Sequence, residues 1–147
     1  MSVLAKLALS GAALLLAIQL VPVARSNTPL NPANVIYAGE VVPSQVRSIL
    51  DASCQNCHSN QTVWPWYSYV APVSWLLVHD VKKGRSQLNF SEWNTYSAKR
   101  KEQKLEEICE QVMNGDMPDN TYLLIHRGAQ LSQQQREDIC TWAQAPR

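Results

Sequence analysis

The chain has 147 residues, enough for one domain. Apolar residues make up 46% of it and charged residues 17%, a composition that excludes a disordered chain, a collagen-like chain and a coiled coil. The 13 basic and 12 acidic side chains give a formal net charge of +1 with no long run of either sign, so we expect no nucleic-acid partner. The feature of the composition that most restricts the possible functions is the presence of four cysteines together with three histidines.

The chain opens with an apolar segment. Residues 7–23 (LALSGAALLLAIQLVPV) carry no charge, and their number lies between that of a signal peptide's apolar region and the roughly 20 residues of a membrane-spanning helix. Pro22 before Ala24 makes a poor signal peptidase site. We therefore favour a transmembrane anchor within residues 1–26 and keep a cleaved signal helix as the alternative. Either one places the rest of the chain on the periplasmic side of a bacterial inner membrane, where disulfides form.

The next residues predict a linker followed by a folded domain. Residues 27–42 are rich in Pro and Asn and show no sustained period, which is typical of an extended linker. The domain is expected to cover residues 43–147. It opens with a short amphipathic helix, because Val46, Ile49 and Leu50 recur at i, i+3 and i+4.

This helix leads into the sequence CQNCH at residues 54–58. Two thiols three positions apart on one helical turn reach the vinyl groups along one edge of a porphyrin, and the adjoining histidine then lies beneath the iron. The motif predicts one covalent haem c on Cys54 and Cys57, with His58 as proximal iron ligand. A thioredoxin-like redox pair would need a βαβ context, and a zinc knuckle would need a second ligand pair. A structural disulfide within the motif is the simplest alternative.

A six-coordinate haem needs a second axial ligand, and Met117 is the first candidate. It stands in the sequence GDMP, just after a helix expected over residues 98–114. We expect Gly115 to take the left-handed conformation that ends this helix and Pro118 to prevent its continuation, so the thioether is held on a stiff loop. Methionine opposite histidine also raises the reduction potential of the iron. The alternative role for a lone methionine is to fill the core.

Three other side chains are weaker candidates for this position. Met113 falls on the apolar stripe of the 98–114 helix, where core packing explains it. His79 lies on a helix expected over residues 72–84, and His126 follows a short apolar turn. Each histidine is expected to be structural, although either would give a bis-histidine haem in place of the methionine.

The two remaining cysteines, Cys109 and Cys140, lie outside the haem motif. Cys109 is on the 98–114 helix, while Cys140 is on a helix opened by Ser132, with Gln135 three positions later as a capping box. With two thiols left over in an exported chain, one pairing is available. We predict a disulfide that clamps the helix before the methionine loop to the C-terminal helix, with two buried free thiols as the alternative.

These motifs also resemble those of a known family. Beyond CxxCH, the segments WPWYS and LNFSEW, a later GxMPxxxYLLIH stretch and a last helix ending in a tryptophan are similar to the bacterial haem-binding domain family of small, membrane-anchored monohaem c-type cytochromes. The resemblance covers about residues 44–143. It implies haem on Cys54 and Cys57, His58 as an iron ligand and Met117 as the sixth ligand. The family often has a second proline after the Met-Pro pair, where this chain has an aspartate.

The expected molecule is a small, all-α, cytochrome c-like helical domain wrapped around one covalent haem. We expect an electron carrier, not an enzyme, whose partners are redox proteins in the periplasm or membrane. A haem sensor or small peroxidase with an exchangeable sixth ligand is the alternative, since His79 or His126 could act as distal acid-base group. The basic residues of 82–85 are expected to be solvated, or to dock an acidic partner. Six aromatic side chains are expected to seal the porphyrin edge: Trp64, Trp66, Trp75, Trp93, Tyr67 and Tyr69.

Overall fold

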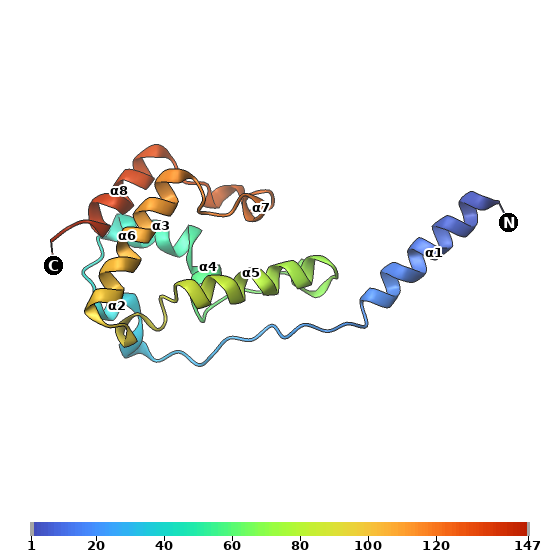
Figure 1. Ribbon diagram of the computed structural model, residues 1–147, viewed down its shortest axis with the longest axis horizontal. Coiled ribbons are helices and arrows are strands. Elements are labelled where there is room, and N and C mark those ends of the chain that lie inside the picture. The colour runs from blue at the N-terminus through green and yellow to red at the C-terminus, as the bar shows by residue number, and fades with distance from the viewer. Residues whose placement is uncertain (1, 147) are drawn as a thin grey trace.

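The computed structural model describes residues 2–146, and within this range it contains helices and no strands (Figure 1). The all-α prediction is therefore confirmed for the described residues. Short 3-10 helices are labelled η, and the elements in chain order are α1 (Val3–Ile18), η1 (Pro32–Asn34), α2 (Ile36–Gly39), α3 (Ser44–Ser53), α4 (Gln55–His58), η2 (Trp66–Tyr69), α5 (Val73–Gln87), η3 (Trp93–Thr95), α6 (Ala98–Asn114), α7 (Asn120–Leu123), η4 (Arg127–Ala129) and α8 (Gln133–Ala143).

The apolar core lies where α3, α6 and α8 meet the segment that joins α5 to α6. Figure 1 shows α6 and α8 side by side, with α5 running separately below them. Leu50, Trp93 and Ile139 are completely buried, and Phe90 is 2% exposed. Burying an apolar side chain of this size contributes about 2–3 kcal/mol to stability, so the LNFSEW segment is part of the core and not a surface loop.

The N-terminal helix α1 is mostly apolar, with Lys6 as its one charged residue, and it has no buried residue. It ends at Ile18. The side chain of the next residue, Gln19, pairs with a distant backbone: its amide donates to the carbonyl of Ala71 (3.0 Å) and accepts from the N–H of the same residue (2.9 Å). No helix in residues 2–146 is long and apolar enough to cross a membrane. The transmembrane helix predicted within residues 1–26 is therefore not found.

The segment after α1 runs along the domain beneath α5 (Figure 1). The guanidinium of Arg25 donates to the carbonyl of Ser68 (3.1 Å), and the amide of Asn27 donates to the carbonyl of Thr62 (3.0 Å). In the other direction, the indole of Trp75 on α5 donates to the carbonyl of Val21 in the N-terminal segment (3.2 Å). These bonds join the start of the chain to α5 and to the segment between the CxxCH motif and α5.

The core also begins earlier than the sequence indicated. Residues 27–42 were expected to be an extended linker, yet η1 and α2 lie within this range and Ile36 is completely buried. The N–H of Ile36 donates to the carbonyl of Phe90 (2.8 Å), which ties α2 to the LNFSEW segment. The short apolar sequence around Ile36 has too few residues to show a helical period, and its packing partner lies far along the chain.

Helix α5 continues past the glycine at which it was expected to end. Gly84 lies inside the helix, which runs to Gln87. A Cβ atom on Gly84 would lie 2.9 Å from the carbonyl oxygen of Cys57, so this position lets α5 approach α4 closely. The glycine therefore serves the contact between the two helices and does not terminate α5.

Candidate haem site

The CxxCH residues comprise Cys54, which follows α3, and the one-turn helix α4. Helix α3 ends at Ser53, and the carbonyl of Cys54 accepts the N–H groups of Cys57 (3.2 Å) and His58 (3.0 Å). This turn holds the two cysteines and the histidine at neighbouring positions, which is the arrangement that the sequence predicted.

Both cysteines of the motif are free thiols. Burial, with a smaller contribution from the neighbouring Cys57, raises the pKa of the Cys54 thiol to about 12. Burial, followed by the carboxylates of Asp80 and Asp119, raises the pKa of Cys57 to about 11. Both groups are therefore neutral thiols at physiological pH, in a setting where thiolate chemistry such as disulfide exchange is slow.

The His58 ring is fixed by two backbone carbonyls. Its Nδ1 atom lies 3.1 Å from the oxygen of Gly84 and 3.1 Å from the oxygen of Leu88. Because carbonyl oxygens only accept, Nδ1 carries the hydrogen, and Nε2 keeps its lone pair for a metal ion. Burial lowers the pKa of His58, and the two carbonyl contacts oppose that shift only in part. The imidazole is thus held neutral and in the tautomer that an iron ligand requires.

The LNFSEW segment secures the residues on either side of this histidine. The N–H of Phe90 donates to the carbonyl of His58 (2.7 Å), and the hydroxyl of Ser91 accepts the N–H of Asn60 (2.9 Å). The amide of Asn89 donates to the side-chain oxygen of Asn60 (2.9 Å). The sequence motifs gave no physical role for this segment beyond its family resemblance, because the bonds join residues about 30 positions apart in the chain.

Arg85 was expected to be a solvated or partner-docking residue, and that expectation is wrong. Its Nε donates to the carbonyl of Ser59 (2.7 Å), and its Nη2 donates to the hydroxyl of Thr62 (2.8 Å) and to Asn27 Oδ1 (2.6 Å). A third nitrogen, Nη1, donates to the carbonyl of Ser26 (2.8 Å). Through these hydrogen bonds the Arg85 side chain joins the loop after His58 to the N-terminal segment.

The methionine loop follows a helix end of the predicted type. Gly115 has φ 78°, the left-handed conformation expected from the sequence. The N–H of Asp116 donates to the carbonyl of Gln111 (3.0 Å), and the N–H of Gly115 donates to that of Val112 (3.3 Å), which together form a Schellman motif. Met117 is 37% exposed. The hydroxyl of Tyr122, five residues later, accepts from the amide of Asn56 (3.2 Å), so the segment after the methionine loop is bonded to the CxxCH turn.

The weaker ligand candidates occupy different settings. Met113 is 45% exposed, so the prediction that it fills the core is wrong. His79 is exposed, whereas His126 is partly buried and its Nε2 is hydrogen-bonded to the hydroxyl of Tyr67. The ring of Tyr122 stacks on His126 with centroids 4.1 Å apart. His126 thus already has polar and aromatic partners, as expected for a structural histidine.

A cavity of about 120 Å³ lies between the CxxCH turn and these aromatic residues. Cys57 is in its wall together with Leu77 and Val81 of α5. Asn56, inside the motif, donates to the hydroxyl of Tyr122 (3.2 Å) and so joins α4 to α7. The residues that line the cavity are Asn56, Cys57, Thr62, Val63, Pro65, Tyr67, Leu77, Val81, Tyr122 and His126.

The comparison with protein families agrees with this geometry. The family model described as haem-binding domain matches residues 13–145, which is most of the chain. The chain belongs to the haem-binding domain family. No curated protein and no solved structure matches it.

One buried atom tests whether the residues of this haem-binding domain fit haem. The indole Nε1 of Trp64 is buried and has no hydrogen-bond partner within residues 2–146. A buried donor of this kind ordinarily has an acceptor, and haem brings two carboxylates. Trp64 lies between Val63 and Pro65, which line the cavity with Cys57. The free thiols, the orientation of His58 and this unpaired donor all fit the group.

The other aromatic residues lie in different settings. Trp66 is 78% exposed and Tyr69 is 60% exposed, while Trp93 is completely buried in the core. The Trp93 indole donates to Glu40 Oε1 (2.9 Å) and is therefore satisfied within the protein. Of the six aromatic residues expected to seal a porphyrin, Tyr67 is the one in the cavity wall.

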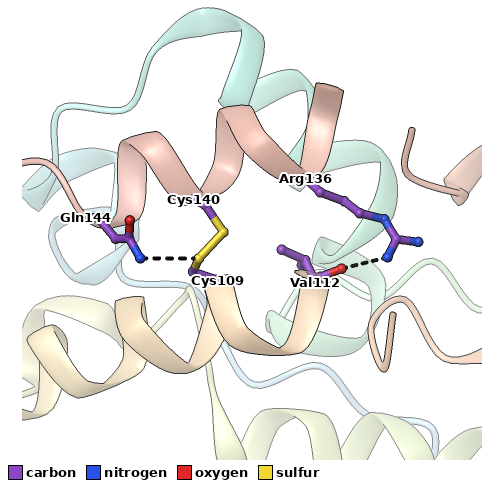
Figure 2. Close-up of a disulfide and its surroundings, with 5 residues drawn as sticks. All are labelled: Cys109, Val112, Arg136, Cys140 and Gln144. Carbon is purple, nitrogen blue, oxygen red and sulfur yellow. Dashed lines mark hydrogen bonds between the residues drawn. A yellow bond between two sulfur atoms is a disulfide. The ribbon is translucent and has the colours of Figure 1, made fainter. Parts of the chain in front are cut away.

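The remaining two cysteines form the predicted disulfide. Cys109 of α6 and Cys140 of α8 are bonded, with Cα atoms 4.7 Å apart (Figure 2). The side chain of Ser132 accepts from the N–H of Gln135, and the Gln135 side chain accepts from the N–H of Ser132, which confirms the capping box at the start of α8. The bridge joins the helix that precedes the methionine loop to the last helix of the chain.

Proposed function

We propose that this haem-binding domain is a monohaem c-type cytochrome that carries single electrons outside the cytoplasmic membrane. The observation that carries the proposal is the arrangement at residues 54–58. Two free thiols lie on one turn, and His58 follows them with its Nδ1 bound by two carbonyls, so that Nε2 is left for iron. A structural disulfide between Cys54 and Cys57 would not require His58 to be held in this orientation.

Each residue of the motif has a defined task in the proposal. The thiols of Cys54 and Cys57 each add across a vinyl group of haem, so that a sulfur–carbon bond forms and the thiol hydrogen goes to the other vinyl carbon. His58 gives the Nε2 lone pair to the iron. When bound, haem supplies an iron that changes between the ferrous and ferric states by one electron.

Met117 is proposed as the sixth ligand. Support comes from the stiff turn that carries it and from the hydrogen bond between Asn56 and Tyr122, which joins the CxxCH turn to the segment after Met117. His126 is engaged by Tyr67, and His79 is exposed. A closed sixth position suits an electron carrier better than a peroxidase, because a peroxidase needs an open site with an acid-base group beside it. We therefore propose that the protein is not an enzyme.

The site of action is proposed from the chemistry of the chain. The Cys109–Cys140 disulfide is typical of a compartment outside the cytoplasm, and the apolar residues of α1 are typical of an export segment. We propose that the protein acts on the periplasmic side of the bacterial inner membrane, where it remains attached through its N-terminal segment, and exchanges electrons with redox proteins there. Fractionation of cells that express the full chain tests the location.

The covalent attachment is tested by mass spectrometry of the protein made in cells that mature c-type cytochromes. The expected product carries the mass of one haem, and acid-acetone extraction leaves the colour with the protein. The double variant Cys54→Ala, Cys57→Ala should carry no extraction-resistant haem. Its matched control, Cys109→Ala with Cys140→Ala, also removes two cysteines but should keep the haem. Extraction-resistant haem in the first double variant would show that the assignment is wrong.

A further inference from the structure

The turn that carries Met117 is hydrogen-bonded to the last carbonyls of α6. Gln111 accepts the N–H groups of both Asp116 (3.0 Å) and Met117 (3.1 Å), and Val112 accepts the N–H of Gly115 (3.3 Å). The position of the methionine backbone therefore depends on where these two carbonyls point.

Arg136 of α8 binds one of these carbonyls from outside the turn. Its Nη1 donates to the carbonyl of Val112 (2.9 Å), as Figure 2 shows. A Cβ atom added to Gly115 would lie 3.3 Å from the same nitrogen, so the guanidinium lies directly against the turn. The positive charge stands at the C-terminus of α6, where it is favoured by the helix dipole.

The disulfide fixes the helix that presents this arginine. Cys140 is one turn after Arg136 on α8 and is bonded to Cys109, which lies one turn before Val112–Met113 on α6. The two helices are thus joined by a covalent bond and, one turn further along, by the guanidinium. The second of these contacts is the one that reaches the methionine turn.

We propose that Arg136 is a positioning residue for the axial methionine, an inference that rests on the proposed role of Met117 as sixth ligand. The guanidinium holds the Val112 carbonyl and the face of Gly115, and so keeps the turn in the conformation from which the thioether binds iron. A hydrogen bond from a charged donor is stronger than one between neutral groups. Its loss is therefore expected to favour dissociation of the methionine at least about tenfold.

Competition with added imidazole tests this in the ferric protein. The weak far-red band from sulfur–iron ligation reports the bound methionine, and imidazole replaces the methionine when the turn opens. In Arg136→Gln the imidazole concentration that removes half of the band should fall about tenfold, and the midpoint potential of the iron should fall. In Arg136→Lys, which keeps a cationic donor, the change should be smaller than in Arg136→Gln.

Controls separate this role from general stability and from the identity of the ligand. Arg127→Gln removes an exposed arginine of η4 and should leave the imidazole midpoint unchanged. Far-UV circular dichroism at the assay temperature shows that each variant is folded. A wild-type imidazole midpoint in folded Arg136→Gln overturns the proposal, as does an equal shift in Arg127→Gln. A far-red band that persists in Met117→Ala would instead overturn the proposed ligand, whatever the arginine variants show.

Discussion

The two sides of the proposed iron site are built differently. On the His58 side, backbone groups about 26–32 residues further along the chain bind the histidine and its neighbours, and the partly buried ring lies beside Phe90, with centroids 6.2 Å apart. On the Met117 side, a single turn at the end of α6 carries a side chain that is 37% exposed. That turn is secured by contacts to α8. The contacts to His58 should therefore be lost only when the core unfolds, whereas the Met117 turn should open on its own.

The largest effect is expected from the core beneath His58. Trp93→Ala removes a completely buried side chain whose indole donates to Glu40. The free energy of unfolding should fall by about 3–5 kcal/mol, because the substitution leaves a cavity in the segment that holds the histidine. Urea denaturation measures it. Trp66→Ala, at a residue that is 78% exposed, is the matched control, and a cost as large as that of Trp93→Ala would contradict the difference in packing.

Loss of the disulfide should come next and should affect the two sides unequally. In Cys109→Ala with Cys140→Ala, the cross-link between positions 31 residues apart is absent. The loop-entropy relation gives a cost of about 3.7 kcal/mol in the free energy of unfolding. The sulfur–iron band should disappear at a lower urea concentration than the helical circular dichroism, with haem still attached. Simultaneous loss of both signals would show that the methionine turn is not an independent unit.

A smaller effect is expected at the turn itself. Gly115 has φ 78°, which costs a residue with a side chain about 1–2 kcal/mol. Gly115→Ala should therefore lower the free energy of unfolding by this amount and weaken the far-red band. Gly128→Ala is the matched control, because its Cβ would meet nothing within 4 Å. If both alanine variants behave alike, the left-handed turn does not control the methionine.

The smallest effect is expected at the indole of Trp64, whose N–H resonance should differ between the haem-loaded and the haem-free protein. Because Trp64 Nε1 has no partner within residues 2–146, its indole N–H resonance should shift when haem is bound and a carboxylate becomes available. Nuclear magnetic resonance with ¹⁵N labelling measures this. The exposed indole of Trp66 should keep its shift in both forms. Trp64→Phe should identify the resonance, and an unchanged Trp64 signal would mean that no haem carboxylate reaches it.

The features that the sequence predicted correctly are local ones. The Gly115 turn and the Ser132–Gln135 capping box are specified by residues within four positions of one another. The Cys109–Cys140 pairing could be predicted from the number of cysteines, because only these two of the four lie outside the haem motif. Helical periodicity also placed α3 and α6 at their observed positions.

The features that the sequence did not reveal depend on distant backbone atoms. Carbonyl groups such as that of Leu88 hold His58, and every residue type has a carbonyl, so no residue pattern marks them. Gly84 was expected to end α5 because glycine is common at helix ends. Glycine is also found where two helices come close together, and only the position of Cys57 in the structure shows that Gly84 has this second role. Met113 lies beside the stripe of buried residues on α6, and a rotation of one residue separates a core position from an exposed one.

The central claim is that Cys54 and Cys57 bind haem while Cys109 and Cys140 bind each other. A tryptic peptide map under non-reducing conditions tests both halves at once, because cleavage after basic residues separates the four cysteines. The expected result is one haem on peptide 48–82 and a disulfide between peptides 105–127 and 137–147. A Cys54–Cys57 disulfide, or free thiols in peptide 48–82 of protein from cells that mature c-type cytochromes, would contradict the claim.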